Sequence, residues 1–249
     1  MHSEAAKGWR GSPIVDWDLF FDKEVDVWSG NAGCKSGGRG SSRLGLPFLR
    51  ASQVSIEIPL GDIPFTVRQS CDSISSVVWD CGIAMANFLL ESSAHPLGAV
   101  LDVGTGTGVA GIAALRLGAQ SVMFTDNVFS PTLEENLQSF SSHNARFQQW
   151  DWSNGEEVLP TLLSSDFDTV LCSDVCYDHT LHSHLVKFLS RIRCGRIIFA
   201  YKPRHIAHEK RFFKSLSLQF DLEWSADTGN SFGVFIFIGL PRLSACNAT

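Results

Sequence analysis

Three glycines alternate along the segment Asp102-Val103-Gly104-Thr105-Gly106-Thr107-Gly108, which directly follows a short apolar run. Glycine lets the backbone turn tightly and lets a ligand approach the main chain closely. A turn of this kind, between a buried strand and a helix, is a common site for nucleotide-derived ligands. We therefore expect Gly104, Gly106 and Gly108 to bind a cofactor.

Two cofactors fit this glycine pattern. Gly106, Gly108 and Gly111 also satisfy GxGxxG, and Asp126 follows about 20 residues later, as in dinucleotide-binding proteins. Asp102 favours the other cofactor, because a carboxylate beside the loop would repel a pyrophosphate but attract the ammonium group of a methionine. We predict that the loop binds S-adenosylmethionine, and a nicotinamide-dependent oxidoreductase is the alternative.

Further polar and aromatic residues follow the next strand-like runs. Asp126 comes directly after the run 122–125, where a carboxylate can accept hydrogen bonds from both hydroxyls of a ribose. Asp151 and Trp152 follow a third run, and an acceptor beside an aromatic face suits the amine and ring of an adenine. We expect these three residues to bind the cofactor, although Trp152 could instead close the core.

The segment Ser173-Asp174-Val175-Cys176-Tyr177 follows a strand-like run that ends at Cys172. We expect Ser173 to face the cofactor, and Asp174 and Tyr177 to lie beside the methyl acceptor. Displacement at a methyl group mainly requires an aligned acceptor lone pair in a site without water. If the acceptor is a lysine, with a pKa near ~10.4, about one molecule in 2500 is neutral at pH 7.

Two side chains could help such an amine. Asp174 can hold it by a hydrogen bond, and Tyr177 can offer its hydroxyl or its ring face. The alternative interpretation is that Asp174 caps the next helix.

Other reactive residues show weaker patterns. His179, His182 and His184 do not share one helix face and have no matching acids, so we expect no metal site. The seven cysteines are an odd number without a CxxC pair, which disfavours a disulfide framework and favours a reducing compartment. No stretch resembles a nucleophile with its base, so we do not expect covalent catalysis.

Composition limits the partners. The 249 residues carry a formal net charge of −6, which disfavours nucleic-acid binding and favours a cationic partner. The first residues lack the pattern of a signal peptide, and no run approaches the ~18 apolar residues of a membrane span. We expect a protein of the cytoplasm, with the nucleus as a second location, that acts on another protein and binds no membrane; a monomer is compatible with these features.

Elements that must position these residues alternate between strand and helix patterns. The strand patterns are 99–103, 122–125, 146–150, 168–172 and 196–201, and the helix patterns are 77–89, 109–117, 131–140 and 181–189. This alternation predicts an α/β, doubly wound, mostly parallel sheet. The runs 218–224 and 232–240, separated by a turn-rich stretch at 227–230, predict an antiparallel edge. The runs 54–58 and 63–67 predict an N-terminal β-ribbon that turns at Gly61-Asp62.

The N-terminal region has a different character. Residues 29–45 are rich in glycine, serine and basic residues, and they predict a mobile linker. Five aromatic residues precede it, and they form either a docking segment or an arm folded onto the domain: Trp9, Trp17, Phe20, Phe21 and Trp28. We therefore predict an arm and linker at 1–50, a catalytic domain at 51–243 and a tail at 244–249.

From about Val54 to Leu240 the chain resembles the seven-strand methyltransferases of family 16, the lysine methyltransferase-like group. Trp79 in Val77-Val78-Trp79-Asp80 is similar to that family's tryptophan before the first core helix, near the cofactor. Asp102–Gly108 resembles its glycine motif, and Asp151-Trp152 is similar to its adenine-side pair. Asp174-Val175-Cys176-Tyr177 fits its DxxY motif, which is associated with the substrate lysine.

The resemblance implies a Rossmann-like methyltransferase fold with a seven-strand sheet, a cofactor contact at Trp79 and methylation of a protein lysine. Relatives modify histidine or arginine, so these acceptors are alternatives. Amino methyltransferases of nucleic-acid bases usually have an NPPY-like motif in place of DxxY, and its absence argues against RNA and DNA substrates. Cys176 departs from the family, which commonly has a bulkier apolar residue there. A protein that retains the fold only to recruit a partner through its aromatic arm is a further alternative.

Overall fold

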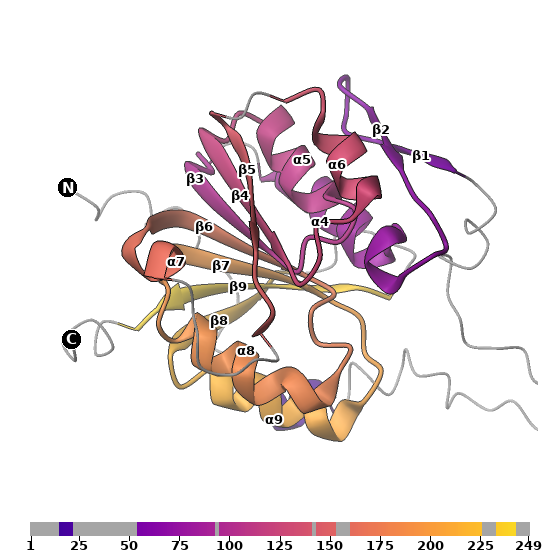
Figure 1. Cartoon of the computed structure of the whole chain (residues 1–249). Helices are drawn as coiled ribbons and strands as arrows, with labels where there is room; N and C mark the ends of the chain where they lie inside the picture. The colour runs from indigo at the N-terminus through magenta and orange to yellow at the C-terminus, as the bar shows by residue number, and fades with distance from the viewer. Residues whose placement is uncertain are drawn as a thin grey trace, which may run out of the picture.

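The computed structural model describes residues 15–21, 54–92, 95–140, 143–152, 160–225 and 233–242. A central sheet lies between two layers of helices (Figure 1). The predicted linker at 29–45, Trp9, Trp28 and the turn at 227–230 lie outside the described residues. The division of the chain at residues 50 and 243 therefore stays a prediction.

The sheet has the predicted architecture. In the described residues its seven strands are β3 (Ala99–Val103), β4 (Ser121–Asp126), β5 (Ala145–Gln149), β6 (Asp166–Ser173), β7 (Arg193–Tyr201), β8 (Phe220–Ser225) and β9 (Phe235–Pro241). Their order is β5-β4-β3-β6-β7-β9-β8. The strands from β5 to β7 are parallel, whereas β9 pairs antiparallel with both β7 and β8. The order reverses direction at β3, so the ends of β3 and β6 flank the expected ligand crevice.

Helices cover both faces of the sheet. On one face lie α4 (Asp80–Glu91), α5 (Val109–Arg116) and α6 (Pro131–Leu137), and on the other lie α7 (Pro160–Ser164), α8 (His182–Leu189) and α9 (Ile206–Leu216) (Figure 1). The first of these helices begins at Asp80, later than predicted, because Val77 is extended after the 3-10 turn η3 (Ile74–Ser76). The segment Ile74–Glu91, which includes η3 and α4, is apolar and long enough to cross a membrane by composition alone, but 61% of it is buried in the protein. Core packing explains that apolar composition.

Neither α7 nor α9 was predicted from the sequence. In α9 the apolar stripe of Phe212, Phe213 and Leu216 is interrupted by Glu209, which is also fully buried. A charged residue on the inner face hides the helical period, because periodicity analysis assigns it to the solvent side. The physical reason for its burial is a set of hydrogen bonds described below.

The N-terminal ribbon is confirmed and supports the glycine loop. Its strands β1 (Ser55–Ile58) and β2 (Phe65–Arg68) pair antiparallel, and alternate residues are buried. The Arg68 N–H donates to Asn136 Oδ1 at 2.8 Å, and the Asn136 amide donates to the Thr107 carbonyl at 2.9 Å. One side chain of α6 thus connects the ribbon to the loop.

The described part of the N-terminal arm folds onto the domain. It forms the short helix α1 (Trp17–Leu19), and Trp17 stacks on Phe213 of α9 with 4.9 Å between ring centroids. The Phe20 ring lies 5.3 Å from that of Phe237 in β9. Asp18 forms ion pairs with Lys210 and Lys214. Of the two interpretations of the arm, these seven residues support folding onto the domain.

Candidate functional site

One cavity of about 540 Å³ lies at the carboxyl ends of β3, β4 and β6. Ligand pockets commonly have about 300–1,000 Å³. Nine of its lining residues were predicted from the sequence: Trp79, Gly104, Gly106, Asp126, Asp151, Trp152, Ser173, Asp174 and Tyr177. The predicted residues Asp102 and Gly108 are not among those that line it.

The glycine loop forms the floor of this cavity. Gly104 and Gly106 have φ angles of 62° and 56°, which residues other than glycine rarely adopt. A Cβ on Gly104 would lie 2.8 Å from the Trp152 ring, and one on Gly106 would lie 3.2 Å from the Ser75 carbonyl oxygen. Both positions favour glycine, because a side chain would press on Trp152 or on the backbone of Ser75. Gly108 instead precedes α5 and packs on Leu133, so its role is to admit the turn.

Asp102 lies beneath the loop, where it organises the backbone. Its Oδ2 accepts hydrogen bonds from the Thr105 hydroxyl at 2.6 Å and from the Gly111 N–H at 3.1 Å. The other oxygen, Oδ1, is buried without a partner among the described residues. Burial raises the pKa of this carboxyl to about 7, against the hydrogen bonds from Thr105 and Gly111. Asp102 was expected to contact an ammonium group directly, but in the structure it lies behind the cavity wall.

Asp126 has the geometry expected for a ribose acceptor. Its Oδ2 accepts from the Gly106 N–H at 2.8 Å and its Oδ1 from the Asn127 N–H at 2.8 Å. Burial raises its pKa, although these backbone bonds oppose the shift. A carboxylate has about four acceptor positions, and a backbone bond from Val128 occupies a third one. The carboxylate is thus fixed at the cavity wall with acceptor capacity left for a ligand.

Aromatic residues border the cavity on two sides. Trp152 covers Gly104, and its ring centroid lies 6.0 Å from that of Trp150 in an edge-to-face arrangement. Trp79 immediately precedes α4, and its indole N–H donates to the Ile74 carbonyl at 2.9 Å. Asp151 lies beside Trp152 in the lining. Asp151 and Trp152 thus offer an acceptor and an aromatic face side by side, as an adenine-sized ring would require.

Asp174 lies at the end of β6 in an unusual backbone conformation. Its φ is 60°, and in the described residues it is the one non-glycine residue with positive φ. Its N–H donates to the Ala200 carbonyl at 2.9 Å, which continues the pairing of β6 with β7. The alternative helix-capping role belongs instead to Asp178, whose carboxylate accepts from the Thr180 N–H.

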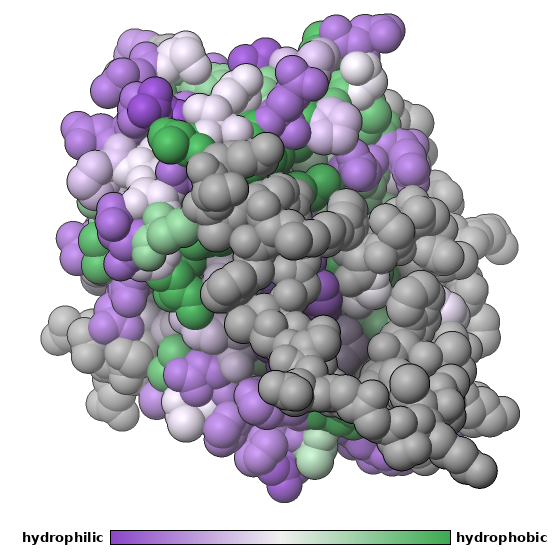
Figure 2. Space-filling model, turned by 90° about the vertical axis from the view of Figure 1, so that its right-hand side faces the viewer, coloured by the Kyte–Doolittle hydropathy of each residue, from purple (hydrophilic) through white to green (hydrophobic). Residues whose placement is uncertain are grey.

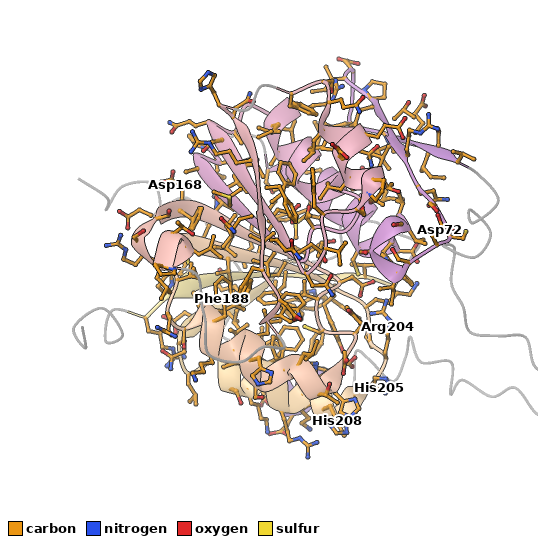
Figure 3. All side chains as sticks on the ribbon, in the orientation of Figure 1. Asp72, Asp168, Phe188, Arg204, His205 and His208 are labelled. Carbon is orange, nitrogen blue, oxygen red and sulfur yellow. The ribbon has the colours of Figure 1, made fainter. Side chains whose placement is uncertain are left out.

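The carboxylate of Asp174 is held by Arg204, a residue that the sequence analysis missed. Both terminal nitrogens of Arg204 bond to it, Nη1 to Oδ1 and Nη2 to Oδ2, the second at 2.6 Å. The guanidinium Cζ also lies 5.9 Å from the centre of the Trp79 ring. Figure 3 shows Arg204 between the two helical layers, close to where the strands end. The rule that found Asp174 also applies here, because Arg204 closely follows the end of β7.

Further residues connect the walls of the site. Lys202 Nζ lies 2.7 Å from Oδ2 of Asp80, the first residue of α4, and this carboxylate is almost fully buried. Glu209 accepts a hydrogen bond from the Arg204 N–H at 2.9 Å and another from the Tyr201 hydroxyl. The segment 202–204 thus links α4, the loop after β6 and α9.

Tyr177 is the most exposed of the predicted site residues, at 37% of its surface. Burial of its hydroxyl raises its pKa, and the charges of Asp126, Asp178 and Asp174 act in the same direction. The hydroxyl therefore stays protonated at neutral pH and can donate a hydrogen bond, but it cannot serve as a base.

The histidines do not form a metal centre in the described part of the chain. His179 contacts His205 and His208, with 5.5 and 4.1 Å between ring centroids. No group of three His, Cys, Asp or Glu side chains among the described residues could hold a metal ion. This rim of imidazoles lies beside Arg204, at the start of α9 (Figure 3).

The residues present fit S-adenosylmethionine. Gly104 and Gly106 line the cavity with backbone alone, Asp126 offers acceptors, and Trp152 offers a ring face. Apolar side chains form small patches among polar ones on the face shown in Figure 2. At the mouth of the cavity, Ile74, Val128 and Tyr177 are exposed apolar groups.

A family model named lysine methyltransferase matches residues 64–219, more than half of the chain. The protein N-lysine methyltransferase METTL21A of Danio rerio is 25% identical over 190 residues, which cover 72% of this chain and 84% of that protein. The protein N-terminal and lysine N-methyltransferase efm7 of Schizosaccharomyces pombe is 28% identical over 153 residues. That match covers 55% of this chain and 60% of efm7.

Solved structures share the fold. SMU.776, solved in complex with S-adenosylhomocysteine (SAH), has a TM-score of 0.53 at 12% identity, covering 76% of this chain and 57% of that chain. A candidate S-adenosylmethionine-dependent methyltransferase from Streptococcus mutans has a TM-score of 0.50 at 14% identity. Its match covers 75% of this chain and 56% of that one.

Proposed function

This chain belongs to the lysine methyltransferase family, and from that premise we propose that it methylates a lysine side chain of another protein. The observation that supports this proposal most strongly is that Asp174 and Tyr177 share one cavity with the glycine loop. S-adenosylmethionine, when bound, supplies a methyl group on a positively charged sulfur. The family match also decides against the nicotinamide-dependent oxidoreductase, whose overlapping GxGxxG has a structural explanation.

That explanation lies in Gly111. It belongs to α5, and a Cβ there would lie 2.3 Å from the Phe124 ring of β4. Gly111 therefore lets α5 pack closely on the sheet, where a larger residue would clash with Phe124. The third glycine of the dinucleotide pattern therefore has a reason that is independent of any pyrophosphate.

Several residues predicted to bind the cofactor line one part of the cavity, which we call its cofactor side. We propose that Asp126 accepts hydrogen bonds from the ribose hydroxyls, and that Asp151 and Trp152 bind the adenine. The backbone of Gly104 and Gly106 lines the cavity and would contact the methionine part, while Asp102 holds the loop from below. Trp79 and Ser173 also line the cavity, and we propose that they contact the cofactor.

The acceptor side is formed by Asp174 and Tyr177. We propose that an amine enters beside Asp174, which can accept a hydrogen bond from it, and that the Tyr177 hydroxyl or ring aligns the lone pair. In the transfer, the amine nitrogen bonds to the methyl carbon, the carbon–sulfur bond breaks and the sulfur keeps its electrons. The nitrogen then loses one proton to water, so charge and atoms balance.

Labelling tests this function directly. The protein is incubated with S-adenosylmethionine labelled in its methyl group and cell extract, and labelled protein is hydrolysed to amino acids. We expect label in methyl-lysine, and loss of labelling in Asp174→Ala, which removes both acceptor oxygens, with SAH affinity unchanged within about threefold. Label in methyl-histidine or methyl-arginine would select those acceptors, and label in RNA but not protein would contradict the substrate class. Tight SAH binding without any transfer would favour a protein that retains the fold for recruitment.

The compartment is a separate proposal. Three buried cysteines in the described residues are free thiols: Cys81, Cys172 and Cys176. Free thiols are typical of reducing compartments. They support our proposal that the protein acts in the cytoplasm, with the nucleus as a second location.

A further inference from the structure

Two arginine–aspartate pairs join β6 to β7, one near each end of the strands. Arg193 and Asp166, at the start of the strands, form an exposed pair with 3.0 Å between Nε and Oδ1. Arg204 and Asp174, beyond the ends of the strands, form a bidentate pair whose side chains are 28% and 9% exposed. An exposed ion pair contributes little to stability, because water screens both charges. In a pair shielded from water the screening is weaker, so each charge strongly affects the other. The second pair lies in the wall of the acceptor site.

The hydrogen-bonding capacity of Asp174 is largely used within the protein. A carboxylate has about four acceptor positions. Arg204 occupies two of them, and the Cys81 thiol of α4 also hydrogen-bonds to Asp174. About one position is left for a ligand. Asp174 can therefore accept one hydrogen bond from an incoming amine, but it cannot act as a full counter-ion for an ammonium group.

We propose that Arg204 is a positioning residue for methyl transfer: by cancelling the charge of Asp174, it makes the acceptor site favour a neutral amine over an ammonium ion. This inference rests on the proposed lysine methyltransferase function. An unpaired carboxylate beside the acceptor would hold the ammonium form, whose nitrogen has no lone pair to attack the methyl carbon. The paired carboxylate keeps one acceptor oxygen and removes the attraction.

Arg204 is itself held in place. Glu209, fully buried in α9, accepts from the Arg204 N–H at 2.9 Å through Oε1 and at 3.2 Å through Oε2. Burial alone would lower the pKa of Arg204, but the hydrogen bonds and charge of Asp174 raise it above its usual value. The guanidinium is therefore charged at neutral pH.

Other titratable groups face the pair from the packed elements: Asp80 and Cys81 of α4, Lys202 after β7, the imidazoles of His179 and of His205 and His208 at the start of α9, Glu209 of α9, Tyr177 after β6 and Asp126 of β4. Asp80 is compensated by Lys202 at 2.7 Å. Burial raises the pKa of Cys81, so this thiol stays neutral. Removal of the Arg204 charge is consequently the change that leaves Asp174 uncompensated.

The test compares the pH dependence of kcat in three variants. The acceptor is the protein that the wild-type enzyme labels in extract, purified and used at saturating concentration, because kcat reports ionisation in the bound complex. In Arg204→Gln, the acidic limb of the kcat profile should move to higher pH by about one unit or more. In Asp174→Asn, which leaves the arginine uncompensated, the limb should move to lower pH. Arg193→Gln removes the matched pair at the other end of the same strands, and its profile should remain unchanged.

Two further measurements separate this role from a structural one. SAH affinity and the melting temperature are determined for each variant, and we expect the affinity of Arg204→Gln to stay within about threefold of wild type. A uniform loss of kcat at all pH values, with the limb unmoved, would overturn the inference. If Arg204→Gln does not fold, the kcat profile of Asp174→Asn tests the inference alone. An acidic limb that stays at the wild-type pH or moves to higher pH in that variant would contradict the inference. Failure of wild type to form methyl-lysine would reject the proposed function itself, and the inference with it.

Discussion

Asp102 shows how one buried carboxyl can set the pH dependence of stability. In the unfolded chain it ionises near its usual pKa of 3.8, whereas burial raises the pKa of the folded state to about 7. As pH rises between these values, the unfolded chain loses a proton that the folded protein keeps, so the free energy of unfolding falls. Between pH 5 and 8 this loss amounts to about 3 kcal/mol.

Asp102→Asn should remove this dependence. Relative to wild type, the variant should gain about 3 kcal/mol of unfolding free energy between pH 5 and pH 8, because it has no proton to lose. Urea unfolding at both pH values measures the difference. Parallel profiles for the two proteins would show that the buried carboxyl ionises near its usual pKa.

Substitution of Gly104 tests whether the cavity tolerates a side chain at this position. A control glycine with positive φ outside the cavity separates this effect from backbone strain. Gly104→Ala should weaken SAH binding more than tenfold, because its Cβ would lie 2.8 Å from the Trp152 ring. Gly118→Ala is the matched control, since its φ is +90° but a Cβ would meet nothing within 4 Å. Both variants should lose about 1–2 kcal/mol of stability from the left-handed backbone. Equal SAH affinity in the two, measured by calorimetry, would contradict the assigned floor of the cavity.

The sequence located residues that follow strands better than it located their contacts. Asp126 and Asp174 were predictable because the carboxyl ends of parallel strands meet at one edge. Asp102 was placed at the correct strand end, but the direction of its side chain depends on the space left by Gly111 in α5. The pairing of Arg204 with Asp174 joins residues 30 apart, which no local pattern reports.

At the scale of elements, helix α1 and its neighbours cover the aromatic face of α9 and β9. Trp17 is 5% exposed, and it packs on Phe213 at 4.9 Å and on Phe237 at 5.2 Å between ring centroids. Trp17→Ala should therefore lower the unfolding free energy by about 3–5 kcal/mol. Leu218→Ala, at a side chain that is 72% exposed, should change it by less than about 0.5 kcal/mol. Chemical unfolding of both variants provides the comparison, and equal losses would place Trp17 outside the core.

Strands and the helices next to the glycine loop were predictable from period alone. Strand β3 has the predicted bounds, and α5 ends within a residue of the prediction because Gly118 follows it. Helix α9 was missed because Glu209 lies on its buried face. That burial is stabilised by the Tyr201 hydroxyl and the Arg204 N–H, which come from a different element. Tertiary hydrogen bonds of this kind leave no trace in the periodicity of the helix itself.

At the scale of the whole molecule, cofactor binding should stabilise the complete fold. A ligand that binds only the folded state at 100 times its Kd adds about 2.7 kcal/mol. For a chain of this size the melting temperature should rise by about 5–10 °C with SAH. Scanning fluorimetry with SAH and with NAD at equal concentrations measures the selectivity. A shift with NAD alone would contradict the assignment of the glycine loop.

The position of β9 also affects how the protein is made. This strand lies between β7 and β8, and its Phe237 contacts Trp17 and Phe20 of the arm. On the ribosome the arm is synthesised early, but the surface that receives it is completed only when β9 emerges. Asp18 and Lys214, which meet across this surface, are 196 residues apart in the chain. Contacts of such long range form late in folding. The arm is thus synthesised before the strand that receives it, and its docking marks the completion of the sheet.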